Sequence, residues 1–177
     1  MSSYCDFAPG QPFHAEYHEH EYGFPLQQDD ALFGRLLLEI NQAGLSWLTI
    51  LKKKDAFQRA YSAFDVDRVA SYDDADRARL LADAGIVRNR LKVQAAIENA
   101  RRIQGLRAEY GSFRGWLDAH HPRPTEDWTR LFRRTFRFTG GEITREFLLS
   151  TGYLEGAHQK HCPVYARVLA AQPAWIR

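Results

Sequence analysis

The sequence predicts an all-α protein, a compact single-domain helical bundle that spans residues 1–177. Apolar residues recur at three- and four-residue spacing in several segments, whereas sustained alternation of apolar and polar residues and Asn-Gly or Asp-Gly hairpin signals are absent. A length of 177 residues with 45% hydrophobic residues suits one core. No internal repeat or linker divides the chain, so a single domain is expected.

The first predicted helix begins at Asp29 or Asp30, either of which can cap it, and Gly44 can end it in a left-handed turn. Ser46 is the predicted cap of a second helix, which begins at Trp47. The apolar stripe of the first helix consists of Leu32, Phe33, Leu36, Leu37 and Ile40.

Two short helices are expected over residues 66–70 and 74–84, and Gly85 ends the second of them. The longest helical pattern follows, from about residue 88 to residue 107. Its inner stripe is predicted to contain Leu91, Val93, Ala96, Ile97, Ala100 and Ile103. Shorter helices are expected over residues 127–134, 142–150 and 162–171.

The segment 74–107 is typical of a degenerate helix-hairpin-helix. A turn at Gly85 would expose backbone N–H groups at the start of the long helix, where the helix dipole favours a phosphate. Arg88, Arg90 and Lys92 would flank that phosphate and contact a DNA backbone without reading its sequence. An ordinary helical hairpin that turns on a glycine is the alternative.

Four residues at the two ends of the chain form a candidate zinc site. His158 and Cys162 are four residues apart, which on a helix places both on one face, and Cys5 and His18 lie near the other end. A Cys2His2 set is typical of structural Zn²⁺, with no position left open for water. Such a zinc staple would join the N- and C-terminal segments. In the alternative, Cys5 is an idle thiol and Cys162 a small core residue.

The choice of ligands stays open, because three further histidines lie close to these residues and could replace them: His14, His20 and His161. The chain has only two cysteines, so a disulfide is not expected in a reducing compartment and a shared metal is favoured.

The charge pattern suits a polyanionic partner. The net charge is only +2, but Lys and Arg are absent before Arg35 and gather within residues 52–54, 88–107 and 123–145. Solvated helix faces would give the same pattern. No apolar run approaches the roughly 18 residues that span a bilayer, and no signal peptide pattern begins the chain. A cytoplasmic protein without a membrane partner is expected.

A candidate binding pocket lies where the first predicted helix meets the second. Glu39 is in the last turn of one helix and Trp47 opens the next, so a planar ligand could stack on the indole while the carboxylate binds its polar edge. A surface carboxylate and a core tryptophan are the alternatives.

These segments resemble the bacterial 3-methyladenine DNA glycosylase I family over nearly the whole chain. The matching motifs are YHEHEYGFP at 17–25, LE at 38–39, QAGLSWLTILKK at 42–53, DAGIVRNRLK at 83–92, FRFTG at 136–140 and the pair His158 and Cys162.

The resemblance implies a role for each matched residue. Glu39 is the catalytic residue that contacts a flipped base, Trp47 stacks on that base, and Tyr17 lines the same pocket. Phe7, His14 and Tyr22 stand at further base-binding positions, where the family has tryptophan, tyrosine and tryptophan. Gly141 and Glu142 also depart from the family pattern. Cys5, His18, His158 and Cys162 fall on its zinc-ligand positions.

The implied activity is removal of 3-methyladenine from double-stranded alkylated DNA, which leaves an abasic site. Leu45, beside Gly44 at the helix junction, is the candidate wedge for the gap left by the flipped base. No acidic residue lies between Gly85 and Ile97, which fits a cationic base that is already a good leaving group. A monomer with no obligate protein partner is expected.

Three other readings remain open at this point. The first is a glycosylase of the same fold that acts on another modified base. The second is a non-catalytic protein that binds damaged DNA, and the third is a hydrolase with an open zinc site.

Overall fold

A computed structural model describes residues 3–177, and in that range every regular element is helical. The α-helices are α1 (Tyr4–Phe7), α2 (Pro12–His20), α3 (Asp29–Gln42), α4 (Trp47–Ala60), α5 (Val66–Ala70), α6 (Asp74–Ala82), α7 (Arg90–Tyr110), α8 (Phe113–His120), α9 (Thr125–Thr135), α10 (Gly141–Ser150) and α11 (Pro163–Ala170). Short 3-10 turns cover Ala8–Gly10, Ser62–Phe64 and Ala174–Ile176. The all-α prediction is confirmed.

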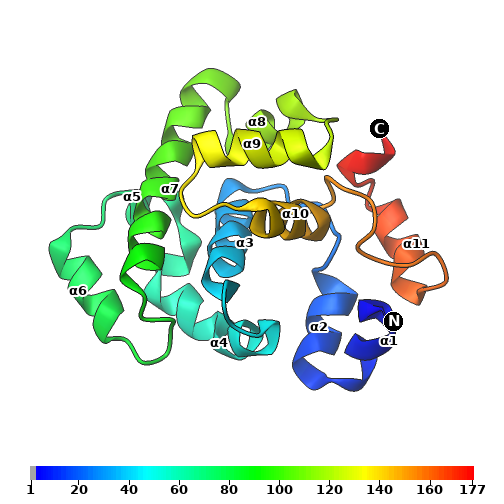
Figure 1. The fold of residues 1–177 in the computed structure, drawn as a ribbon, viewed down its shortest axis with the longest axis horizontal. Helices are drawn as coiled ribbons and strands as arrows, with labels where there is room; N and C mark the ends of the chain where they lie inside the picture. The colour runs from blue at the N-terminus through cyan, green and yellow to red at the C-terminus, as the bar shows by residue number, and fades with distance from the viewer. Residues whose placement is uncertain (1–2) are drawn as a thin grey trace.

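Helix α3 is the centre of the molecule, with α10 beside it and α4 following its C-terminal end (Figure 1). Residues 32–41 of α3 are all buried, because neighbouring helices cover it on every side. Helices α5 to α7 lie on one flank, and α1, α2 and α11 lie on the other (Figure 1). The two ends of the chain therefore meet on the same side of the bundle.

Asp29 and Asp30, the expected N-caps of α3, cap other helices instead. Asp29 is the first residue of α3, and its carboxylate accepts hydrogen bonds from the backbone N–H groups of Phe113 and Arg114, at 2.9 and 3.2 Å. Asp30 accepts one from the N–H of Val66 at 3.0 Å. The capping prediction for these two residues is wrong, because each carboxylate stabilises the N-terminus of a different helix, α8 or α5. Ser46 does cap α4, through the Thr49 N–H.

Most predicted helices are present, with boundaries shifted by a few residues. Helices α1, α2 and α8 were not predicted: α2 mixes five histidine and glutamate residues into nine positions, and α8 has only eight residues with an internal glycine. The inner stripe of α7 is buried as predicted except at Leu91, which is 68% exposed. Leu91 is in the first turn of α7, ahead of the point where the helix enters the core.

Within residues 3–177, no helix combines the length and the apolar character needed to cross a bilayer.

Candidate active site

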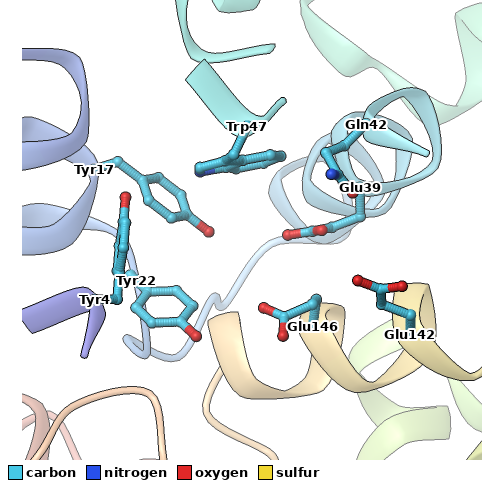
Figure 2. A pocket seen from close by; sticks show the side chains of 8 residues that line it. All are labelled: Tyr4, Tyr17, Tyr22, Glu39, Gln42, Trp47, Glu142 and Glu146. Atoms are coloured by element: carbon cyan, nitrogen blue, oxygen red, sulfur yellow. The ribbon is translucent and has the colours of Figure 1, made fainter. Parts of the chain in front are cut away.

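A cavity of about 310 Å³ opens between α2, α3, α4 and α10 (Figure 2). Its walls combine aromatic rings with carboxylates. The lining residues are Tyr4, Tyr17, Tyr22, Glu39, Gln42, Trp47, Glu142 and Glu146. The structure thus places Glu39, Tyr17, Tyr22 and Trp47 in a single cavity, although they come from three separate segments of the sequence.

Glu39 is the buried acid of this cavity, with only 5% of its surface exposed. Burial raises the pKa of its carboxyl from 4.5 to about 8, against the lowering effect of Arg35 and with a further contribution from Glu146. Arg35 does not bond to Glu39, because its guanidinium donates to the Ser150 carbonyl and the Glu21 carboxylate. The Glu39 carboxyl is therefore available to a ligand.

Tyr17 and Trp47 form an aromatic corner opposite Glu39. Their rings meet edge to face with centroids 5.2 Å apart. The Tyr17 hydroxyl and the Trp47 Nε1 are both buried and have no hydrogen-bond partner within residues 3–177. Figure 2 shows the Tyr17 hydroxyl pointing into the cavity. A buried donor without a partner is costly, so both groups suit a polar ligand.

Phe7 and His14 do not line the cavity, and their predicted role in base binding stays a prediction. Tyr4 forms the wall instead, and its hydroxyl is hydrogen-bonded to His14 Nδ1 at 2.9 Å. Phe7 packs edge to face against the far side of this pair, with ring centroids 5.1 Å from His14. The cavity therefore has a phenol from Tyr4 on this wall, with His14 behind it.

Sequence reasoning gave no role to four of the lining residues: Tyr4, Gln42, Glu142 and Glu146. Tyr4 reaches the cavity through the fold of the N-terminal segment, which no local pattern indicates. Glu142 and Glu146 are four residues apart on α10, and this spacing could have indicated that they share one face of a helix.

The four candidate zinc ligands converge at a single point, where their donor atoms all lie within 4.8 Å of one another. The Sγ atom of Cys162 is 3.7 Å from His18 Nε2 and 3.7 Å from His158 Nδ1, and Cys5 Sγ is also 3.7 Å from that Nδ1. Tetrahedral Zn²⁺ with bonds of about 2.3 Å to sulfur and 2.0–2.1 Å to nitrogen requires S···N separations of roughly 3.5 Å. The donor set and its spacing therefore fit zinc.

The convergence does not arise as predicted, because His158 and Cys162 do not share a helix. They lie in a loop with a turn from Gln159 to Cys162, and Cys162 is only the N-cap of α11. The backbone carbonyl of Tyr22 lies 2.6 Å from His158 Nε2, the contact that orients a metal-binding imidazole.

The geometry also decides between the alternative histidines. His14 is bound to Tyr4, whereas His20 and His161 have exposed side chains beside Glu19 and Asp6. None of the three belongs to the Cys2His2 cluster.

Gly44 and Leu45 form an exposed turn between α3 and α4. Gly44 has a φ of +80°, a conformation that favours glycine, and an added Cβ would meet nothing within 4 Å. Gln42 Nε2 donates to the Leu45 carbonyl at 2.7 Å, which fixes the turn. The Leu45 side chain is 39% exposed, as a residue that inserts into DNA must be.

Lys92 has a different role from the predicted phosphate contact. It is 5% exposed, and its Nζ donates to the carbonyls of Asn41 and Ala43 at 2.8 and 2.6 Å. The prediction for Lys92 is therefore corrected: it ties the start of α7 to the Gly44–Leu45 turn. The two candidate DNA-binding loops are held side by side as a result.

The turn between α6 and α7 presents part of the expected phosphate site. The Gly85 N–H already donates to Asp83 Oδ1 at 2.8 Å, so it is not free for a phosphate. Arg88 and Arg90 are exposed and suit contacts with a polyanion. Their role in DNA binding stays a prediction.

Comparisons with known proteins agree with this geometry. The chain matches the family model for methyladenine glycosylase over residues 7–130. It is 32% identical to DNA-3-methyladenine glycosylase 1 of Escherichia coli (strain K12), over 91% of this chain and 96% of that protein. Identity to DNA-3-methyladenine glycosylase of Haemophilus influenzae (strain ATCC 51907 / DSM 11121 / KW20 / Rd) is 28%, over 92% and 98% of the two chains.

Solved structures give the same result. A crystal structure of a 3-methyladenine DNA glycosylase I variant in complex with 3-methyladenine superposes with a TM-score of 0.82 at 32% identity, covering 92% of this chain and 97% of that one. The Staphylococcus aureus enzyme superposes with a TM-score of 0.81 at 34% identity, covering 90% and 95%. The chain therefore belongs to the methyladenine glycosylase family.

Proposed function

We propose that this protein is a DNA glycosylase that removes 3-methyladenine from alkylated double-stranded DNA by hydrolysis and leaves an abasic site. The observation that carries the proposal is the buried Glu39 carboxyl, which shares one cavity with the unpartnered Tyr17 hydroxyl and Trp47 Nε1. Family relatives and structural neighbours named for this activity support it.

The chemistry required of the protein is modest. Methylation at N3 makes the nucleobase cationic, so the base leaves as a neutral molecule when the glycosidic bond breaks and its electron pair returns to the ring. Water adds to the sugar C1′ and loses a proton. Glu39 stabilises the cationic base by a charge-assisted hydrogen bond, and the aromatic rings attract the same positive charge.

The base must first leave the duplex stack, at a cost of a few kcal/mol that is smallest for a poorly paired lesion. Leu45 is placed to fill the gap, and Lys92 holds its turn beside Arg88 and Arg90. In this proposal the protein acts as a monomer.

We further propose that Cys5, His18, His158 and Cys162 bind structural Zn²⁺. The metal would supply a rigid crosslink between the chain ends, and all four of its positions would be taken by protein ligands.

The proposal is tested by incubating the purified protein with methylated DNA and identifying released bases by mass spectrometry. Release of 3-methyladenine is expected from the wild type, and Glu39→Gln should lose it by at least about 100-fold while keeping its helical circular dichroism. Release of a different base, or binding without release, would overturn the assignment. Full activity of Glu39→Gln would overturn the assignment of this cavity as the base-binding site.

A further inference from the structure

The base pocket contains a further acidic side chain near Glu39, that of Glu146. Glu39 projects from α3 and Glu146 from α10, and Figure 2 shows both side chains directed toward the same space. A planar ligand stacked at the aromatic corner would thus meet Glu39 from α3 and Glu146, with its neighbour Glu142, from α10.

The local contacts of Glu146 do not account for its position. One oxygen pairs with the neighbouring Arg145 at 3.1 Å, but Arg145 is largely exposed and such surface pairs contribute little. The other oxygen accepts no hydrogen bond from residues 3–177. Partial burial raises the pKa of Glu146, against the lowering effect of Arg145 and with a further contribution from Glu142.

An independent feature of the same cavity points to a ligand. The Tyr17 hydroxyl is fully buried, faces the cavity and has no partner. Several carboxyl groups around one volume, next to unpaired donors, suit a ligand that carries a positive charge and more than one polar group on its edge.

We propose that Glu146 is a second recognition carboxylate that acts with Glu39 to make the pocket selective for cationic N-alkylated purines over neutral bases. This inference rests on the proposed function of the pocket. It assigns the discrimination to charge: a bound cation stabilises the ionised form of the two carboxyl groups, whereas a neutral base does not.

The test measures binding of two ligands of nearly equal shape by isothermal titration calorimetry at pH 9, where Glu39 is ionised. One is 3,9-dimethyladeninium, a permanent cation, and the other is neutral 3-methyladenine. Glu146→Gln should weaken binding of the cation about tenfold and binding of the neutral base less than about threefold. Glu109→Gln, which removes the same charge from an exposed site at the far end of α7, should change neither.

Thermal melting of Glu146→Gln shows whether the variant is folded, and its Tm should equal or exceed that of the wild type. Equal affinity of wild type and Glu146→Gln for the cation would overturn the role of Glu146. So would an equal loss for both ligands. Failure of the wild type to release 3-methyladenine from methylated DNA would instead overturn the proposed function, so the two failures are distinguishable.

Discussion

Burial of Glu39 has an effect on stability that can be measured. Its pKa is about 8 in the folded protein against 4.5 in the unfolded chain, so between these values the folded state holds a proton that the unfolded state has released. Stability must therefore fall as the pH rises from about 4.5 to about 8. Below 4.5 the carboxyl is neutral in both states and contributes no such dependence.

We predict that Glu39→Gln is more stable than the wild type by a few kcal/mol at pH 8.5 and that the difference disappears near pH 4.5. Glutamine fills the same space without a buried charge. Urea unfolding of both proteins across this range measures the difference. A difference independent of pH would contradict the assigned burial of the charge.

The sequence indicates some residues of the pocket and not others, for a physical reason. Glu39 and Trp47 flank a single helix junction, so their proximity follows from local structure and the motif around them. Tyr4 and Glu146 reach the pocket only through packing between segments distant in sequence. Sequence periodicity carries no information about such packing. It therefore cannot show which aromatic residue of the N-terminal segment reaches the pocket.

Between elements, the bond from Lys92 to the α3–α4 turn replaces the expected contact with phosphate. A buried ammonium shared by two carbonyls releases no counterion from DNA, whereas an exposed arginine does. A structural role and a phosphate contact for Lys92 therefore predict different salt dependences of the DNA affinity.

We predict that Lys92→Met lowers affinity for abasic-site DNA about tenfold, because the Leu45 turn loses its attachment, but leaves the slope of log affinity against log salt unchanged. Arg88→Ala is the matched comparison and should reduce that slope by about 1. Fluorescence anisotropy over 50–200 mM salt gives both values. If Lys92→Met reduces the slope, Lys92 contacts a DNA phosphate after all.

Asp29 and Asp30 show why helix caps were partly mispredicted. Both have the residue type and the position of an N-cap for α3, yet the starts of α5 and α8 lie against them and take their carboxylates. Ser46 was correctly predicted because no other helix start competes for its hydroxyl. Local pattern identifies a capable residue, and tertiary packing decides which helix it serves.

At the scale of the whole molecule, the Cys2His2 cluster joins the N-terminal segment to the loop that precedes α11. Removing a tetrahedral metal would leave two thiols and two imidazoles crowded at one point and would separate the chain ends.

We predict about one zinc per chain by inductively coupled plasma mass spectrometry and a Tm lower by at least about 5 °C after chelation or in Cys162→Ala. Because no coordination position is open, base release at a temperature below unfolding should persist without metal. His161→Ala, outside the cluster, should retain both zinc and Tm. A Cys162→Ala protein with unchanged Tm and zinc content would contradict the site.

The cluster also affects the order in which parts of the protein can fold during translation. Tyr4 and Tyr17, which wall the base pocket, are the immediate neighbours of Cys5 and His18, whose partner Cys162 is translated 144 residues after His18. Until residues 158–162 emerge, α2 can pack against α4, but Cys5 and His18 lack the other two members of their cluster. The N-terminal wall of the pocket is therefore crosslinked to the rest of the chain only near the end of synthesis.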